Sequence, residues 1–132
     1  MLEIIAGIFF ILHGLVHLLY AGQSWRMFEL RPGMLWPDGS WLFSNLIGDG
    51  ATRTLASIAL VLAALGFAAG GLGLFLRQDW WRPAAVGAAV FSSALYLLLW
   101  DGKWEAWDAK GGIGLLINAV ILVIVLIIKW PS

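Results

Sequence analysis

The chain has 132 residues, of which 61% are hydrophobic and 12% are charged, and its formal net charge at pH 7 is zero. An average soluble domain has about 25% charged residues, so this composition excludes an ordinary water-soluble domain and a disordered chain. A nucleic-acid partner is excluded because the chain has no basic excess. The absence of cysteine excludes disulfides, thiol nucleophiles and thiolate metal sites. A chain of this length accommodates one domain, which we take as residues 1–132.

The charged residues leave four long uncharged stretches, at 4–25, 54–76, 83–100 and 111–128. A helix needs about 20 mostly apolar residues to cross a hydrocarbon core of about 30 Å, and a charge at the bilayer centre costs at least about 2.5 kcal/mol. Backbone groups in lipid must be hydrogen-bonded internally, so these stretches should be helical. We therefore predict a single transmembrane domain whose four spans cover about 4–24, 51–76, 83–100 and 111–129.

A cleaved signal peptide is the alternative interpretation of the first stretch, because Tyr20-Ala21-Gly22 is similar to a small-residue cleavage site. Signal peptides begin with a positively charged region, whereas the residues before this stretch include Glu3 and no Lys or Arg. We expect the first stretch to be retained as a membrane span.

The connection between the first two predicted spans is long and contains turn signals at 31–33 and 36–40. Between them and the second span lies the apolar segment Trp41–Ile47, with Ser40 before it and Gly48 after it. This pattern predicts a short helix in the membrane interface, capped by Ser40, with Asp49 capping the second span. The predicted fold is an all-α, up-down four-helix bundle that is integral to the membrane and has a long first connection containing this interfacial helix.

Four antiparallel spans place both termini on one face of the membrane and the first and third connections on the other. The tryptophans follow this map as an aromatic belt, since none lies near the middle of a predicted span. The face of the first and third connections has five basic residues, Arg26, Arg31, Arg53, Lys103 and Lys110, and the opposite face has Arg77, Arg82 and Lys129. The positive-inside rule then favours a multi-pass protein of the cytoplasmic membrane with both termini outside.

Small residues recur along one side of the second predicted span, at intervals of three and four: Ala56, Ala59, Ala63, Gly66, Gly70 and Gly73. Small residues at this spacing let helix backbones approach closely, and such packing drives helix association in lipid. The stripe is interpreted as an internal packing surface of the bundle. A homodimer seam is the alternative.

Polar side chains of the predicted spans gather in the half of the membrane near the first and third connections. His13, His17 and Tyr20 lie on one helical face because they are four and three residues apart. The third span adds Ser92 and Tyr96, and the fourth adds Asn118. Polar groups in a membrane are costly unless they face the bundle interior, so these side chains predict a polar-lined, ligand-binding cavity in one half of the membrane. The alternative is that the histidines only hold helices together through hydrogen bonds.

A histidine pair at i and i+4 can ligate a metal, but no Asp or Glu lies within a predicted span to complete the set. His13 and His17 lie on one helix, so they cannot occupy opposite axial positions of one haem. We expect neither metal nor haem at this pair, and no other cofactor. Catalysis also has little support, because the serines lack a nucleophile motif such as G-x-S-x-G.

The segment Ile11-Leu12-His13-Gly14-Leu15-Val16-His17, in the first of four short spans, resembles the small DoxX-like membrane proteins. Those proteins have a His-Gly pair in the first helix of a four-helix bundle. A basic residue often follows that pair by a few positions, and here His17 stands near that place. The resemblance implies a link to membrane redox chemistry, since some relatives accompany quinone-reducing enzymes.

The leading hypothesis is an accessory membrane protein that is surrounded by lipid and binds a small amphiphile, a quinone or a lipid. The ligand would contact His13, His17, Tyr20, Ser92, Tyr96 and Asn118. Two alternatives remain open at this point: a small dimeric transporter or proton-coupled channel, and a structural subunit of a larger membrane complex.

Overall fold

The computed structural model describes residues 1–131, and every regular element among them is a helix. The elements are α1 (Leu2–Ser24), α2 (Phe43–Phe75), α3 (Trp81–Leu99), the 3-10 helix η1 (Trp107–Lys110), α4 (Gly112–Leu122) and the π-helical turn η2 (Val123–Ile128). The prediction of an all-helical fold with four principal helices is confirmed. Helices α1, α2 and α3 are long and apolar enough to cross a membrane, and α4 with η2 forms a shorter apolar helix, Gly112–Ile128.

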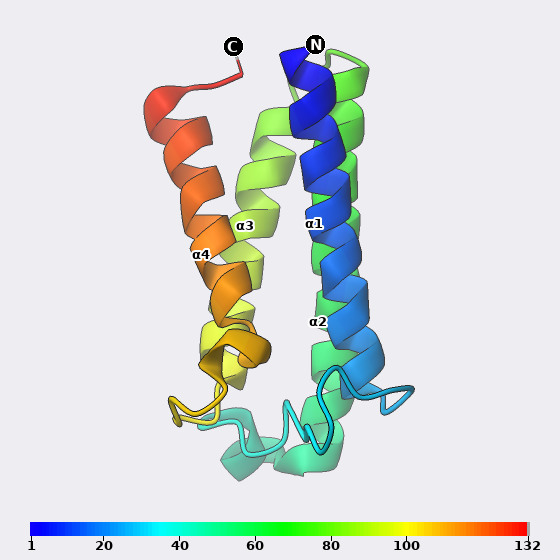
Figure 1. Cartoon of the computed structure of the whole chain (residues 1–132), viewed down its shortest axis with the longest axis vertical. Coiled ribbons are helices and arrows are strands. Elements are labelled where there is room, and N and C mark those ends of the chain that lie inside the picture. Colours follow the sequence, from blue (N-terminus) through cyan, green and yellow to red (C-terminus); the bar gives the residue numbers. More distant parts are fainter. Residues whose placement is uncertain (132) are drawn as a thin grey trace.

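The four helices run alternately up and down, and both termini lie at the same end of the molecule (Figure 1). We call the opposite end, formed by residues 25–42 and 100–111, the connection end. Extensive packing joins α1 to α2, α2 to α3 and α3 to α4, so each helix packs mainly on its neighbours in sequence. Helices α1 and α4 consequently form the two edges of the bundle that face each other across an opening.

Helix α2 begins with a short segment in the first connection and then bends. Gly48 breaks the helical path with φ 79° and ψ 164°, and the residues before it lie across the connection end (Figure 1). The N-cap position is Leu42 rather than the predicted Ser40, although Oγ of Ser40 still accepts a hydrogen bond of 3.2 Å from the N–H of Phe43, the first helical residue. The expectation that Asp49 caps the second span is wrong. Its Oδ1 instead accepts hydrogen bonds from the Gly39 N–H and the Ser44 hydroxyl, and so fastens the turn before the helix.

Glycine and alanine bring the backbones of neighbouring helices together. A Cβ placed on Gly70 would lie 3.2 Å from the Cβ of Ala85, and one on Gly66 would lie 2.9 Å from that of Ala88, so this side of α2 faces α3. Gly73 likewise meets Trp81. Five members of the predicted stripe are buried, and Gly66 is half-buried.

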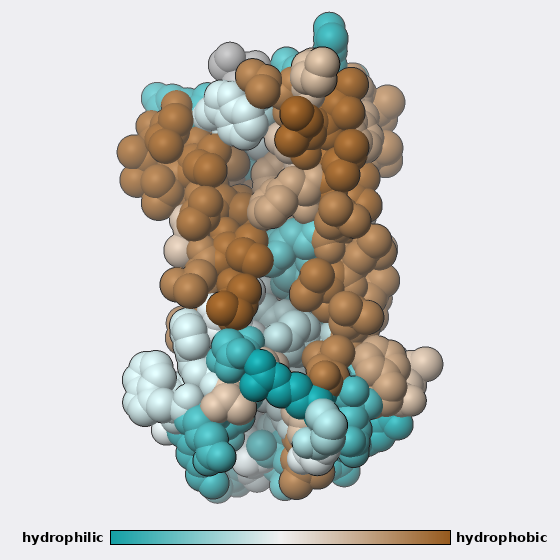
Figure 2. Space-filling model, viewed as in Figure 1, coloured by the Kyte–Doolittle hydropathy of each residue, from teal (hydrophilic) through white to brown (hydrophobic). Residues whose placement is uncertain are grey.

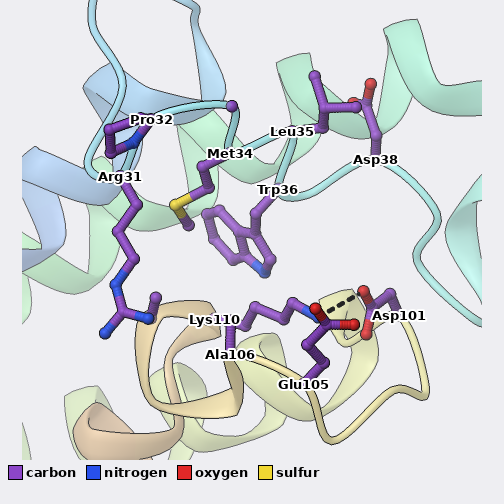
Figure 3. A pocket seen from close by; sticks show the side chains of 12 residues that line it. Arg31, Pro32, Met34, Leu35, Trp36, Asp38, Asp101, Glu105, Ala106 and Lys110 are labelled. Atoms are coloured by element: carbon purple, nitrogen blue, oxygen red, sulfur yellow. Dashed lines mark hydrogen bonds and ion pairs between the residues drawn. The ribbon is translucent and has the colours of Figure 1, made fainter.

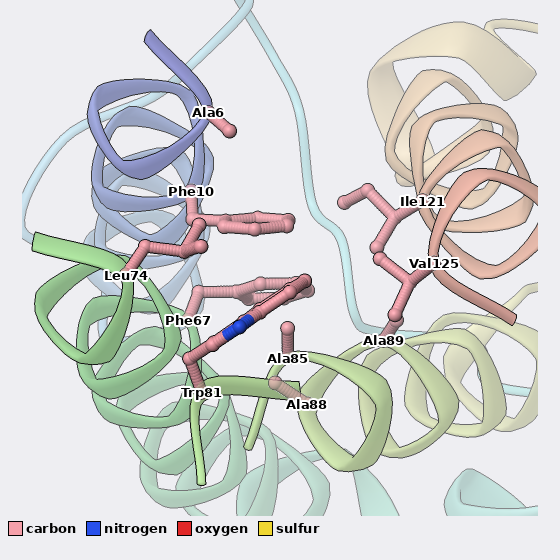
Figure 4. Close-up of a cluster of buried hydrophobic side chains, with 10 residues drawn as sticks. All are labelled: Ala6, Phe10, Phe67, Leu74, Trp81, Ala85, Ala88, Ala89, Ile121 and Val125. Atoms are coloured by element: carbon pink, nitrogen blue, oxygen red, sulfur yellow. The ribbon is translucent and has the colours of Figure 1, made fainter. Parts of the chain in front are cut away.

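The core has two apolar clusters, one toward each end of the bundle. The cluster toward the termini brings together side chains from all four helices, among them Phe10, Phe67, Trp81 and Ile121 (Figure 4). The cluster toward the connection end includes Leu60, Leu95, Tyr96 and Leu99, and also Trp36, which reaches in from the first connection.

The outer surface of the helices is largely apolar, whereas the connection end is rich in hydrophilic side chains (Figure 2). Large aliphatic side chains such as Leu12, Leu62 and Leu97 are more than half exposed along the helices. A soluble monomer rarely exposes apolar surface on this scale, so the pattern fits helices surrounded by lipid.

Candidate functional site

Four polar side chains from three helices form a buried hydrogen-bond network between the two apolar clusters. Nε2 of His13 lies 2.8 Å from Oδ1 of Asn118, and Nδ2 of Asn118 lies 2.9 Å from Oγ of Ser92. Oγ of Ser92 lies 2.6 Å from Nε2 of His17, and Nδ1 of His17 lies 2.8 Å from the main-chain oxygen of His13. The four side chains are at most 4% exposed. We call this group the His–Asn–Ser network.

The chemistry of the atoms fixes the direction of these hydrogen bonds. Oδ1 of Asn118 and the main-chain oxygen of His13 can only accept, so Nε2 of His13 and Nδ1 of His17 must each donate to them. The Asn118 amide donates to Ser92, and the Ser92 hydroxyl is then free to donate to Nε2 of a neutral His17. The network therefore closes into a ring of four hydrogen bonds, each with one donor and one acceptor.

The network connects three helices. The sequence predicts a polar face on each of them but not which faces meet. His13 and His17 come from α1, Ser92 from α3 and Asn118 from α4. The ring of Phe67 from α2 covers both histidines, with centroid distances of 4.6 Å to His13 and 5.1 Å to His17. The helices thus meet at one polar layer that is enclosed by apolar side chains.

The two tyrosines predicted for the site lie beside the network, toward the connection end. The ring of Tyr96 is 5.6 Å from that of His17, and the ring of Tyr20 is 5.5 Å from that of Tyr96. Trp36 completes the group, with its ring 5.3 Å from Tyr20. The aromatic side chains continue from the network to the connection end, although they contribute no hydrogen bond to the network.

Other polar residues of the spans do not join the network. The hydroxyls of Thr52 and Ser57 donate to main-chain oxygens one turn earlier in α2, those of Gly48 and Arg53. Such hydrogen bonds satisfy a hydroxyl within its own helix. Burial of a polar residue in a span therefore does not identify it as part of the site.

An apolar groove of about 330 Å³ lies between α1 and the α4–η2 helix. Its walls are made by Ile5, Phe9 and Phe10 on one side and by Ile121, Ile124 and Val125 on the other. In Figure 2 two apolar walls flank hydrophilic atoms that are visible in the depth between them. The ring of Phe9 stacks on that of His13, with centroids 6.1 Å apart and planes within 2°. The groove therefore ends next to the His–Asn–Ser network.

A second cavity, of about 340 Å³, lies at the connection end between the first and third connections. Neither this cavity nor the groove is lined by His13, His17, Ser92, Tyr96 or Asn118. The sequence predicted a cavity lined by these side chains. In the structure His13, His17, Ser92 and Asn118 are hydrogen-bonded to one another, and the ring of Tyr96 packs beside that of His17.

Ion pairs fasten the connection end. Asp38 bonds both Arg26, at 2.9 Å, and Arg53, at 2.8 Å, which joins the first connection to the ends of α1 and α2. Arg31 bonds Asp108 across the first and third connections. The hydrogen bond from Arg31 lowers the pKa of the Asp108 carboxyl below its ordinary value.

Among residues 1–131 no group of three or more His, Cys, Asp or Glu side chains is placed to hold a metal ion. The His–Asn–Ser network itself is a small hydrogen-bonding centre next to an apolar groove.

The sequence did not identify Trp36 or the groove residues as parts of a site. Trp36 resembled the other interfacial tryptophans, and the groove residues resembled any lipid-facing side chain. A signal for the groove exists only in the register of α1 and α4, since Phe9 and Ile121 lie one turn from the polar residues His13 and Asn118.

Comparisons of the chain with protein-family models, with curated proteins and with solved structures find no match.

Proposed function

We propose that the protein is an integral four-helix bundle of the cytoplasmic membrane that binds a small amphiphile in the groove between α1 and α4. The observation that carries the proposal is the position of the His–Asn–Ser network at the end of this groove. A ligand site is typically apolar with a few convergent polar groups, and it occupies about 300–1,000 Å³. The groove has the apolar walls and the volume, and the network, which lies beyond the Phe9 wall and does not line the groove, offers polar groups once a ligand moves between α1 and α4.

The ligand's apolar tail lies along the groove, where its contacts with Phe9 and Ile124 replace contacts with lipid. Its polar end lies at the level of His13 and Asn118. A ligand engages these two atoms by displacing the hydrogen bond between them: its carbonyl then accepts from Nε2 of His13, and its hydroxyl donates to Oδ1 of Asn118. Helix α4 packs mainly on α3, so a ligand can enter between α1 and α4 with little disruption.

Two membrane compounds share the required chemistry of an apolar tail and a compact oxygen-bearing head. They are quinones, whose carbonyl oxygens accept hydrogen bonds, and phospholipids, whose ester carbonyls do the same. The resemblance of the His13-Gly14 segment to DoxX-like proteins supports a quinone.

The test is a thermal-shift measurement on the purified protein in detergent, with a short-tailed quinone in one arm and phosphatidylglycerol in the other. We expect stabilisation by the quinone that grows with its concentration, because a ligand that binds only the folded state raises its stability. Ile124→Trp fills the groove and should abolish the shift.

The matched control is Leu126→Trp, which adds the same side chain to the same helix at a position that is exposed and outside the groove. This variant should retain the full shift. The proposal fails if neither compound shifts the melting temperature, or if the two tryptophan variants respond alike. A shift by phosphatidylglycerol alone would assign the groove to a phospholipid.

The proposed orientation places both termini outside the cytoplasm, because more basic residues lie at the connection end than at the end with the termini. The fourth helix, Gly112–Ile128, is near the lower length limit for a span, so the bilayer is expected to thin beside it. Reporter fusions at the C-terminus check the orientation, and activity of a cytoplasmic reporter there would contradict it.

A further inference from the structure

The cavity at the connection end has the features of a second site, separate from the groove. The segment Arg31–Trp36 of the first connection forms one wall, and the third connection forms the other with Asp101, Glu105 and Lys110 (Figure 3). The first connection is held in place by Gln23 of α1, which donates to the main-chain oxygen of Met34 and accepts from the N–H of Leu30. The cavity is therefore built from anchored chain segments.

Trp36 presents a hydrogen-bond donor to this cavity. The residue is only 4% exposed, and its indole Nε1 is buried without a hydrogen-bond partner. Figure 3 shows the nitrogen edge of the ring turned toward Lys110 and Glu105. Contacts of the ring with Tyr20 and Tyr96, and a 2.9 Å hydrogen bond from Arg26 to the main-chain oxygen, fix its position. Buried polar groups are normally paired, so this N–H indicates an acceptor that occupies the cavity.

The wall of this cavity contains both acidic and basic side chains. Nζ of Lys110 lies 2.8 Å from Oδ2 of Asp101, and this pair is mostly buried. Lys110 has three N–H donors, and this bond uses one of them. Glu105 has no ion-pair partner within residues 1–131. The wall therefore has spare donors near Trp36 and one carboxylate that lacks a cation.

The site as a whole is electrically balanced. The acidic groups of the wall and their ion-pair partners are Asp38, Asp101, Glu105 and Asp108, and the basic groups are Arg26, Arg31, Arg53 and Lys110. A ligand with a large net charge would upset this balance in a half-buried place. A ligand that has one charge of each sign would preserve it.

We propose that the cavity binds a zwitterion whose oxyanion accepts hydrogen bonds from Trp36 and Lys110 and whose ammonium group contacts Glu105. Trp41, before α2, and Trp104, between α3 and η1, belong to the connection end and are exposed, and exposed tryptophans mark the level of lipid headgroups. The ligand is therefore the phosphoethanolamine headgroup of a phospholipid, and a soluble phosphoethanolamine ester has the same chemistry. This site is independent of the groove, because the two cavities share no residue.

The test is native mass spectrometry of the purified full-length protein with three probes: phosphatidylethanolamine, phosphatidylglycerol and water-soluble glycerophosphoethanolamine. We expect phosphatidylethanolamine to bind about ten-fold more tightly than phosphatidylglycerol, as one added hydrogen bond to a charged group would produce. Glu105→Gln should bring the two affinities together, because it removes the partner of the ammonium group. Trp36→Phe should weaken phosphatidylethanolamine binding about ten-fold, because it removes the N–H donor.

Trp104→Phe is the matched control, since Trp104 is exposed at the same end and does not line the cavity; it should bind like the wild type. Glu105→Gln keeps the proposal falsifiable if Trp36→Phe does not fold, because Glu105 is exposed and its replacement should not disturb packing.

Equal binding of the two lipids by the wild type, or an unchanged preference in folded Glu105→Gln, would overturn the proposal; a water molecule would then be the sole partner of Trp36. Equally tight binding of glycerophosphoethanolamine would support the site and assign a soluble zwitterion to it. Ile124→Trp should leave the lipid preference unchanged, which separates this site from the groove.

Discussion

The hydrogen bond between Nε2 of His13 and Oδ1 of Asn118 joins α1 to α4, the two helices that otherwise flank an open groove. The bond is 2.8 Å long, and both side chains are buried. At this level the bond connects the first helix to the last, whereas the extensive helix contacts are all between helices that are neighbours in sequence. The position of α4 therefore depends on this bond and on the packing of α4 against α3.

Asn118→Leu should lower the free energy of unfolding by about 1–3 kcal/mol. The leucine has the same branching and number of side-chain heavy atoms, but it leaves the N–H of His13 buried without an acceptor. Unfolding in a titration of denaturing detergent measures the change. Ser57→Ala is the control, because the Ser57 hydroxyl bonds only within its own helix; a loss no larger than that of the control would contradict the role given to Asn118.

His17 and Ser92 should be energetically coupled. Their side chains are 2.6 Å apart in the network, so removal of either one also removes the bond made by the other. A double-mutant cycle with His17→Ala and Ser92→Ala should give a coupling energy of about 1 kcal/mol, within the range measured for hydrogen bonds between membrane helices. Strict additivity of the two losses would show that the hydrogen bond makes no net contribution.

Gly70→Leu should destabilise the monomer by at least about 1–3 kcal/mol, because the new side chain meets the backbone of α3 at Ala85. Gly87→Leu is a matched control on α3, since a Cβ at Gly87 meets nothing within 4 Å. That variant should keep the stability of the wild type. Unfolding and cross-linking measured together decide between the two interpretations of the stripe. A Gly70→Leu protein that is fully stable as a monomer but has lost a dimer would assign the stripe to a dimer seam.

Acid should loosen the contact between the first and third connections. The pKa of Asp108 is lowered in the folded protein by the hydrogen bond from Arg31, so the contact stabilises the fold above the ordinary carboxyl pKa of about 4. This contribution is lost as the pH falls below that value and the carboxylate becomes protonated. Hydrogen exchange of residues 101–110 should therefore accelerate toward pH 3 after correction for intrinsic rates. Asp108→Asn should remove this pH dependence, and an unchanged dependence would show that another group is responsible.

Much of the fold could be predicted from the sequence, because helices with an apolar outer surface contain few charged residues, and the positions of the charged residues show this directly. The lack of charged residues in four stretches predicts four apolar helices. The shared helical face of His13 and His17, and the cost of placing a polar side chain such as that of Asn118 in lipid, predict that these residues face inward. The cap at Asp49 could not be predicted correctly. An acidic residue before a helix is typical of a cap, but its partners here are Gly39 of the preceding turn and Ser44 of the short helical segment before Gly48.

The sequence alone determined that helices dominate, that their outer surfaces are apolar, and that polar side chains of three helices share one level of the bundle. Only the tertiary structure decided that these side chains bond to one another, that α1 and α4 leave a groove, and that Trp36 reaches the core from a connection. The physical reason is that periodicity assigns a side chain to a face of its helix, whereas its partner is set by how the helices pack. Between helices in lipid that packing depends on close contact and hydrogen bonding, because burial from water no longer selects one neighbour over another.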